Sequence, residues 1–336
     1  MNRFTALTDQ AQKNDTTGIL ITNLGTPDSP DVPAVRRYLR EFLSDPRVVE
    51  IPKLVWMIIL HGIVLRTRPA KSAKLYKSIW TEAGSPLMAI SVQQRDKLEQ
   101  ALRSSGQDNF ELKLAMRYGK PSIPTALREF QQQGIQRIIV LPLYPQYAGP
   151  TTGSTFDVIA DELKRWRRVP ELHFIDSYHD HPLYIAALVN SIRSHIDEYG
   201  KPQKLVLSFH GMPKRNHKLG DPYYKQCLET SRLVVEQLEL SEDETVTTFQ
   251  SRFGKAEWLK PYTNATLASL PAQGIKDVAI ISPAFSADCL ETLEELDQEN
   301  RQIFMEAGGE QYRYIPCLNA NEEHIEMMRE LISGAL

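Results

Sequence analysis

The chain has 336 residues, of which 42% are hydrophobic and 24% charged, as in an ordinary soluble globular protein with a sizeable core. Its formal net charge of −3 lacks the basic excess of a nucleic-acid-binding protein. Cys227, Cys289 and Cys317 form no CxxC pair, which argues against a structural zinc site or a disulfide framework and for a reducing, cytoplasmic compartment. Residues 1–17 are polar, so no signal peptide is expected there.

Strands and helices alternate along the chain. The hydrophobic pattern predicts, in order, a strand and turn (18–27), helices (35–42, 72–80, 91–104), a strand (112–118), a helix (125–133), a strand (137–143), a helix (156–165), a strand (172–175), a helix (182–199) and a strand (205–209). The alternation continues through residue 281. This order is typical of an α/β protein with a doubly wound parallel sheet.

The two halves of the chain resemble each other. ILITNLGTP at 19–27 aligns without a gap on LVLSFHGMP at 205–213, which places Leu24 opposite His210. RYGK at 117–120 recurs as RFGK at 252–255, and Gly-Ile precedes an apolar strand at both 134 and 274. We therefore expect two similar α/β halves that face each other across a cleft. Their expected bounds are 17–170 and 171–310, followed by a C-terminal segment, 311–336, that ends in a helix.

The segment 52–65, PKLVWMIILHGIVL, is apolar all round. It is shorter than the roughly 20 residues that cross a bilayer. Two interpretations stay open. The segment is either a buried core helix or an exposed apolar lip. Such a lip would admit an apolar ligand or rest on a membrane surface.

His210 follows a buried strand and precedes the turn Gly211-Met212-Pro213. Strands of a parallel sheet present their last residues to the crevice outside their carboxyl ends, so His210 is expected at the mouth of a cleft. Its imidazole titrates near neutral pH, which suits proton transfer or metal ligation. The alternative is a core or turn histidine with a satisfied hydrogen bond.

An acidic segment follows the strand that ends near residue 282. On a helix, four carboxylates would share one stripe: Asp288, Glu291, Glu295 and Glu299. The ordinary interpretation is a solvated face, but four like charges with no lysine or arginine among them repel one another. Glu291 and His210 form a mixed oxygen and nitrogen pair suited to a divalent first-row metal. Two ligands are too few for a structural ion, so we predict a weak, open metal site.

Five motifs resemble the ferrochelatase family over nearly the whole chain. They are NLGTPDSP (23–30), MRYGKP (116–121), LPLYPQYAGPTTGS (141–154), SFHGMPKRNHKLGDPYY (208–224) and SADCLETLEELD (286–297). The resemblance implies two Rossmann-like domains and a lyase that inserts Fe²⁺ into protoporphyrin IX, releasing two protons, in the last step of haem biosynthesis.

The resemblance also implies roles for particular residues. His210 and Glu291 would be the catalytic pair that handles metal and accepts protons, although it leaves open whether His210 acts as base or as iron ligand. From their place on the acidic stripe near a strand end, rather than from the resemblance, we expect Asp288, Glu295 and Glu299 to relay protons or metal. The porphyrin would be bound by Leu24, Arg68, Tyr76, Ser85, Arg117 and Tyr118. Arg66 lies two residues before Arg68 and competes with it for that role.

Several features depart from other members of the family. Leu24 stands where some members carry tyrosine or methionine, so it cannot ligate the iron of the product haem. Cys289 stands where some carry a histidine, which puts a third metal ligand at that position in doubt. With three cysteines the chain lacks the four that a [2Fe-2S] cluster uses, so no cluster is expected.

The resemblance fixes the expected partners. Protoporphyrin IX and Fe²⁺, the latter as substrate, are the expected ligands, with no organic cofactor and no nucleic acid. We expect a cytoplasmic monomer with peripheral membrane contact through 52–65. Two alternatives remain: a chelatase for another tetrapyrrole and metal pair, and a non-catalytic tetrapyrrole carrier.

Overall fold

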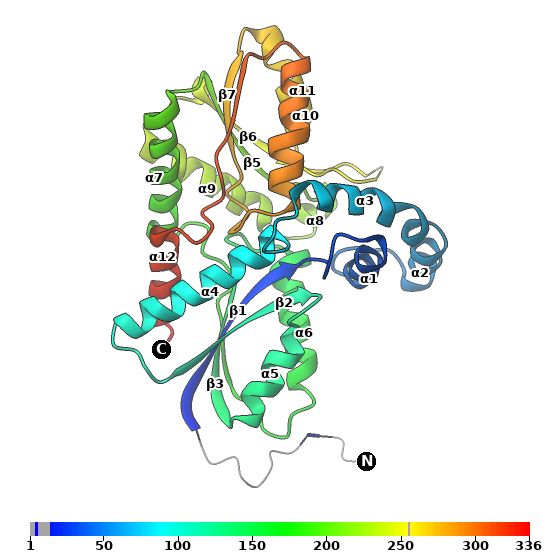
Figure 1. Ribbon diagram of the computed structural model, residues 1–336, viewed down its shortest axis with the longest axis vertical. Helices are drawn as coiled ribbons and strands as arrows, with labels where there is room; N and C mark the ends of the chain where they lie inside the picture. The colour runs from blue at the N-terminus through cyan, green and yellow to red at the C-terminus, as the bar shows by residue number, and fades with distance from the viewer. Residues whose placement is uncertain (1–3, 6–13, 255) are drawn as a thin grey trace. The chain divides into compact units, whose positions relative to one another are not determined.

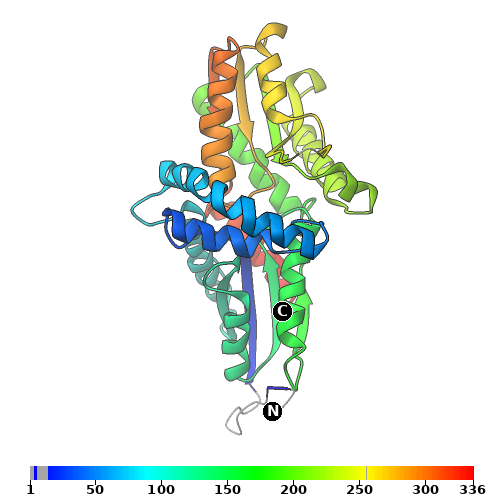
Figure 2. The same ribbon diagram turned by 90° about the vertical axis from the view of Figure 1, so that its right-hand side faces the viewer.

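The computed structural model of the protein describes residues 4–5, 14–254 and 256–336 (Figures 1 and 2). The chain forms two compact units. The first comprises Met1–Leu143, Ala148–Asp176 and Ile325–Leu336, and the second comprises Tyr144–Tyr147 and Ser177–His324.

The first unit is built on a four-stranded parallel sheet with the order β2-β1-β3-β4. Its strands are β1 (Asn14–Gly25), β2 (Phe110–Tyr118), β3 (Ile135–Pro142) and β4 (Glu171–Phe174). Its helices are α1 (Val32–Leu43), α2 (Lys53–Ile59), α3 (Leu65–Ile79), α4 (Pro86–Ser104), α5 (Ile123–Gln132), α6 (Ser154–Leu163) and, from Ile325 onward, α12 (Glu322–Ser333), together with the π-helices η1 (Leu60–Val64) and η2 (Gly149–Gly153).

The core of the first unit lies between its sheet and the pair α5 and α6 (Figure 1). Leu20, Ile138 and Val140 point from the strands toward Phe130 and Ile159 on these two helices. Because both faces of a parallel sheet are covered, its strands read as continuous apolar runs in the sequence. Short polar residues cap α1 and α5: Asp31 accepts a hydrogen bond from the backbone of Ala34, and Ser122 accepts one from that of Thr125.

The second unit repeats this architecture with the strand order β6-β5-β7-β8. Its strands are β5 (Lys204–His210), β6 (Thr245–Gln250), β7 (Asp277–Ile281) and β8 (Gln311–Tyr314). Its helices are α7 (Pro182–Tyr199), α8 (Lys214–Lys218), α9 (Tyr223–Leu238), α10 (Thr263–Ser269) and α11 (Asn300–Glu306), with the 3₁₀ turns η3 (Glu242–Glu244) and η4 (Pro271–Gln273) and the π-helix η5 (Glu291–Glu299). The predicted pair of similar α/β halves is confirmed.

Backbone contacts support the predicted alignment of Leu24 with His210. The next residue in each half is a glycine that touches the neighbouring strand: a Cβ on Gly25 would lie 1.8 Å from the carbonyl oxygen of Tyr118, and one on Gly211 2.3 Å from that of Gln250. Only glycine fits at such a close approach. The two glycines therefore occupy equivalent places.

The match between RYGK and RFGK is offset by two residues in the structure. Met116 donates its backbone N–H to Pro121, and Phe249 donates its own to Pro261, so Met116 and Phe249 are equivalent. It follows that Arg117 corresponds to Gln250 rather than to Arg252. Lys255, the last residue of the second motif, lies outside the described residues.

The units do not follow the bounds expected from the sequence. β4 begins at Glu171 and pairs with β3, so it completes the first sheet instead of opening the second half. β8 pairs with β7 and completes the second sheet, although it begins at Gln311. From Ile325 onward the chain returns to the first unit. In each half, the fourth strand therefore pairs with the third: β4 with β3, and β8 with β7.

The apolar segment 52–65 forms α2 and η1 and is not a buried core helix. Trp56 and Leu60 face inward, and Trp56 donates its indole N–H to the carbonyl of Leu43 at 2.6 Å. The opposite face is open to solvent, with exposed fractions of 83% for Leu54 and 76% for Ile58. The structure thus agrees with the lip interpretation as far as exposure is concerned. Among the described residues, no helix combines the length and apolarity needed to cross a bilayer.

Candidate functional site

His210 is the last residue of β5, and its backbone hydrogen bond fixes what the imidazole offers. Its Nδ1 lies 2.7 Å from the carbonyl oxygen of Gly211. A carbonyl oxygen only accepts, so Nδ1 carries the hydrogen and, in the neutral ring, Nε2 carries the lone pair. The Tyr223 hydroxyl donates to the carbonyl of His210 at 3.0 Å and holds the strand end from the other side. Nε2 is therefore the atom that accepts a proton or ligates a metal.

Gln250 connects the strand of His210 with the helix of Glu291. It lies opposite His210 in the register of β5 and β6, and its carbonyl accepts the N–H of Gly211 at 2.8 Å. Its side-chain amide donates to the backbone carbonyl of Glu291 at 2.8 Å, while its side-chain oxygen accepts from Ser208 at 2.9 Å. All of these groups are built on strand ends or on the first turn of η5. Such rigid elements hold functional groups precisely in place.

The carboxylates of η5 differ in their surroundings. Glu291 and Glu295 are half-buried, and Glu299 is exposed. Burial raises the pKa of Glu295 above its ordinary value, hydrogen bonds from the backbone and hydroxyl of Ser251 lower it, His210 lowers it and Glu291 raises it. His210 and Glu291 therefore both lie close enough to Glu295 to affect its pKa.

Glu294 is a fourth carboxylate of this group that the sequence analysis overlooked. Burial raises its pKa, and the charges of Glu299, Glu295 and Glu291 raise it further. It lies three residues after Glu291, a spacing that puts two side chains on one face of an α-helix, so the sequence pattern already contained the signal.

Asp288 does not lie on the stripe. It precedes the helix, is 5% exposed, and accepts hydrogen bonds from the Tyr314 hydroxyl at 2.5 Å and the Asn319 amide at 2.7 Å. Thr292 and the backbone of Cys317 donate to it as well, at 3.1 and 3.3 Å. A carboxylate with this many donors anchors the start of η5. The expectation of four aligned carboxylates is wrong because the loop continues past Asp288.

Cys289 is 5% exposed, and burial raises the pKa of its thiol, which interacts with the Glu291 side chain. The thiol therefore stays protonated at neutral pH, unlike a metal-bound thiolate. Within the described part of the chain, no three histidine, cysteine or acidic side chains are grouped so as to hold a metal ion.

The predicted porphyrin-binding residues lie in the first unit, mostly at the ends of its elements. Leu24 is half-buried near the end of β1. Tyr76 is 7% exposed and meets Trp80 edge to face, and Ser85 is 5% exposed and accepts a hydrogen bond from the Thr26 hydroxyl at 2.8 Å. Arg68 is half-buried, and this burial lowers its pKa.

Arg66 is exposed, so the structure distinguishes the two arginines by burial. An open cavity of about 530 Å³ in the same unit is lined by none of the six predicted porphyrin contacts. It lies along α1 and is lined by Thr26, Pro27, Asp28, Ala34, Arg37, Tyr38, Arg40, Glu41, Ser44, Met57, His61, Gly119 and Lys120.

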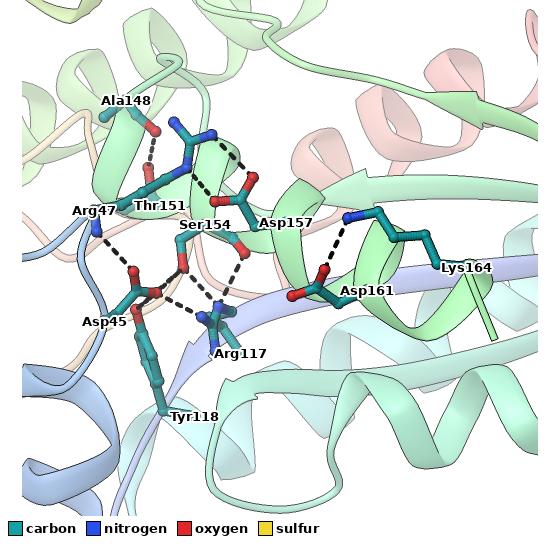
Figure 3. A network of polar contacts seen from close by, with 10 residues as sticks. All are labelled: Asp45, Arg47, Arg117, Tyr118, Ala148, Thr151, Ser154, Asp157, Asp161 and Lys164. Atoms are coloured by element: carbon teal, nitrogen blue, oxygen red, sulfur yellow. Dashed lines mark hydrogen bonds and ion pairs between the residues drawn. The ribbon is translucent and has the colours of Figure 1, made fainter.

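Arg117 and Tyr118 belong to an internal network centred on Asp45 (Figure 3). One guanidinium nitrogen of Arg117 donates to Asp45 at 2.5 Å, and its Nε donates to the carbonyl and the hydroxyl of Ser154. Tyr118 is fully buried and donates its hydroxyl to Asp45 at 2.8 Å. The guanidinium of Arg117 is therefore already engaged by a carboxylate of the protein itself. Sequence reasoning missed Asp45 because it is far from Arg117 in the chain.

The chain is similar to known proteins over nearly its whole length. A profile of the ferrochelatase family matches residues 16–336. "Ferrochelatase 2" of Shewanella oneidensis is 66% identical over 319 residues, covering 95% of this chain and 97% of the relative. "Ferrochelatase" of Shewanella denitrificans is 57% identical over 334 residues, covering 96% and 99%.

Two solved structures share the fold at low sequence identity. The SirB structure from Bacillus subtilis with Fe³⁺ superposes with a TM-score of 0.55 at 12% identity, over 95% of this chain and 94% of that one. CbiX, described as the terminal enzyme of sirohaem biosynthesis in denitrifying bacteria, superposes with a TM-score of 0.52 at 13% identity, over 95% and 99%. From its motifs, its duplicated parallel sheets and its match over nearly the whole sequence, the chain belongs to the ferrochelatase family.

Proposed function

We propose that this protein is a ferrochelatase that inserts Fe²⁺ into protoporphyrin IX to give protohaem, the last step of haem biosynthesis. The observation that carries the proposal is the Nε2 lone pair of His210 beside Glu291 and Glu295. The high identity to relatives that bear the name ferrochelatase supports it.

The reaction replaces two pyrrole protons with one Fe²⁺, so the site must accept two protons in all. His210 Nε2 either takes one of them or ligates the entering iron. Glu291 and Glu295 supply the remaining acceptors, and the raised pKa of Glu295 brings it closer to the range in which a carboxylate takes up a proton near neutral pH. Glu299, which is exposed, leads the protons to solvent. We leave Asp288 out of this relay because its oxygens are occupied.

The first unit supplies the porphyrin contacts in this proposal. Leu24, Tyr76 and Ser85 form the apolar and hydroxyl part of the surface, and Arg68 faces a propionate. Leu24 has no atom that ligates iron, which favours release of the haem product. Arg117 and Tyr118 support this surface from behind, because their polar groups are engaged with Asp45.

The remaining partners follow from the same residues. One chain carries both the metal-handling and the porphyrin-contacting residues, which supports a monomer. The three cysteines are buried and free, which supports a protein without a [2Fe-2S] cluster. We propose a cytoplasmic location and no organic cofactor.

We also propose that the exposed face of α2 and η1 rests on a membrane surface. Its apolar side chains are flanked by cations, as in helices that lie at a bilayer interface. Between residues 53 and 79 the chain has no aspartate or glutamate and carries Lys53, Arg66, Arg68, Lys71, Lys74 and Lys77. This basic excess stands out in a chain of net charge −3 and favours anionic lipids.

Anaerobic Fe²⁺ insertion into protoporphyrin IX, followed by visible absorbance, tests the proposal. Wild type should turn over rapidly, and His210→Ala and Glu291→Gln should lose at least about a hundredfold in kcat while retaining porphyrin binding. Glu306→Gln, at an exposed carboxylate on α11 that takes no part in the proposed reaction, is the matched control. Porphyrin binding without insertion by the wild type would make the protein a carrier, and equal turnover of all variants would remove the roles of His210 and Glu291.

A further inference from the structure

Asp45 lies in the connection between α1 and α2. We call this connection the lip connection, because it leads into α2 and η1, which form the exposed apolar lip. α1 ends at Leu43 and α2 begins at Lys53. Asp45 is 8% exposed, so its carboxylate is withdrawn from water. No step of the proposed reaction uses it.

The Asp45 carboxylate joins three parts of the first unit (Figure 3). One oxygen accepts from Arg117 and from Ser154, both at 2.5 Å, and from Tyr118 at 2.8 Å. The other accepts from the backbone N–H of Arg47 at 2.8 Å. The donors come from the end of β2, from the start of α6 and from the lip connection itself.

The network extends by one more ion pair. Arg47 donates two hydrogen bonds to Asp157 on α6, at 2.5 and 2.9 Å. Asp45 and Arg47 therefore attach the lip connection to the sheet and to α6. Burial alone would raise the pKa of Asp45, but hydrogen bonds from Ser154, Arg47 and Tyr118 and the charge of Arg117 lower it below its ordinary value. The group is an anion held by internal donors.

The same network sits beside Leu24. Arg117 lies between Met116 and Tyr118, which pair across the sheet with Asn23 and Gly25. The Asp45 carboxylate thus links the base of the lip to Arg117 and Tyr118 at the end of β2, the strand that pairs with the end of β1. A buried charge-assisted network of this kind fixes the relative positions of its members.

We infer that Asp45 is a positioning residue for tetrapyrrole binding: it holds Arg117 and the lip connection in the geometry that the porphyrin surface requires. The inference rests on the proposed function for the identity of the ligand. Asp45 touches no substrate. Its effect should appear in the affinity for the macrocycle and not in the chemistry of metal insertion.

The decisive variant is Asp45→Asn, which keeps the shape of the side chain but replaces an acceptor oxygen with a donor. We expect the KM and the fluorescence-derived Kd for protoporphyrin IX to rise about tenfold, in proportion to one lost charged hydrogen bond. The kcat and the KM for Fe²⁺ should stay within about twofold. Asp161→Asn is the control, because Asp161 lies on the same helix as Asp157 but forms its ion pair with the exposed Lys164.

Hydrogen exchange of the ligand-free protein separates this inference from the proposed function. In Asp45→Asn, exchange should accelerate at residues 44–60 and 149–157 and remain unchanged in β5 and β7. Acceleration over the whole chain would indicate general destabilisation and overturn the inference, as would unchanged porphyrin affinity or a loss confined to kcat. If the wild type fails to insert iron, the proposed function fails, while the exchange pattern still decides whether Asp45 anchors the lip.

Ser154→Ala tests the same inference if Asp45→Asn does not fold. It removes the hydroxyl that donates to Asp45 and accepts from Arg117 Nε, and it leaves the charge pair of Asp45 and Arg117 in place. We expect a smaller rise in the KM for protoporphyrin, about threefold, with kcat unchanged. If Asp45→Asn cannot be purified and Ser154→Ala binds protoporphyrin with wild-type affinity, the inference is also overturned.

Discussion

Glu295 illustrates the conflict between function and stability at the level of one residue. Its carboxylate is half-buried next to Glu291, which makes its ionised form unfavourable in the folded protein. His210 and two hydrogen bonds from Ser251 offset this cost only in part, since the pKa remains raised. A purely structural residue at this position would not need to be charged. Strained electrostatics of this kind are typical of functional sites.

We predict that Glu295→Gln is less active but more stable at neutral pH. Because the folded-state pKa of Glu295 is raised, the folded protein holds its proton more tightly than the unfolded chain does. The ionised group therefore costs stability above that pKa, and the cost vanishes as pH falls below the ordinary value of 4.5. Urea unfolding should show a gain in the free energy of unfolding at pH 7.5 that disappears near pH 4. A loss of stability at pH 7.5 would contradict this account.

The residue types of the site were predictable, but their surroundings were not. His210 and Glu291 stood out because each follows a predicted strand and carries a group suited to metal or proton transfer. Asp45, Ser154 and Gln250 gave no such signal. Their roles depend on contacts between segments that are far apart in the chain, and the sequence alone contains no distances.

At the level of elements, the prediction and the structure differ at the π-helix η5. Apolar periodicity indicated a helix over 288–299, and a helix is present from Leu290 onward. Its wider turn follows from hydrogen bonds between residues five apart, which no residue type specifies. η1 and η2 are π-helices too, and both lie within motifs that the sequence analysis singled out. π-bulges often occur at functional sites.

The turn after β5 depends on the absence of a side chain at Gly211. A Cβ there would lie 2.3 Å from the Gln250 carbonyl oxygen and 3.0 Å from the Trp258 ring. Moving the Gln250 backbone away from this Cβ would disturb the pairing of β5 with β6. Gly211→Ala should therefore displace His210 from the strand end. We predict a loss of at least about 2 kcal/mol in the free energy of unfolding, together with a loss of iron insertion.

Gly62→Ala is the matched control, since nothing lies within 4 Å of a Cβ at that position in η1. Replacing a helical glycine there should be neutral or stabilise by up to about 1 kcal/mol. Chemical denaturation of both variants measures the difference. Equal stability of the two variants would show that the strand end tolerates a side chain.

The lip formed by α2 and η1 predicts a lipid-dependent variant. Leu54→Glu with Ile58→Glu places two charges on the most exposed apolar positions, which should cost membrane affinity without disturbing Trp56 beneath them. Cosedimentation with vesicles containing anionic lipid should fall at least about tenfold, while insertion into detergent-solubilised porphyrin is largely preserved. Leu219→Glu, at an exposed leucine of the second unit, should behave like wild type. Equal cosedimentation of all three proteins would refute the membrane contact.

At the scale of the whole molecule, the duplication was the most reliable sequence signal. Two stretches that align over nine residues predicted two similar halves, and the strand orders β2-β1-β3-β4 and β6-β5-β7-β8 confirm them. The bounds were harder to predict, because β4 and β8 are short strands of four residues each at the edge of a sheet. Nothing in so short a run shows which sheet it joins. The return of the chain to the first unit from Ile325 onward likewise depends on tertiary packing.

His324 couples the stability of the second unit to pH. It is fully buried, its Nδ1 donates to the carbonyl of Asn319 at 2.7 Å, and Asn319 in turn holds the Asp288 carboxylate. Its Nε2 is buried without a hydrogen-bond partner among the described residues, so a second proton there has no acceptor. Burial lowers the pKa of His324 from 6.5 to about 4.

The depressed pKa of His324 sets the direction of the pH effect. The unfolded chain takes up a proton as pH falls through 6.5, whereas the folded chain stays neutral until about pH 4. Stability is therefore complete above pH 6.5 and falls by about 1.4 kcal/mol per pH unit between these values, to a total of roughly 3 kcal/mol. His324→Gln keeps a donor for the carbonyl of Asn319. It should lower by one the number of protons that the chain takes up on urea unfolding between these pH values. His173→Gln, at an exposed histidine, should leave that number unchanged. If both variants follow the wild-type slope between pH 7.5 and 5, His324 takes up its proton in the folded state and does not limit stability in acid.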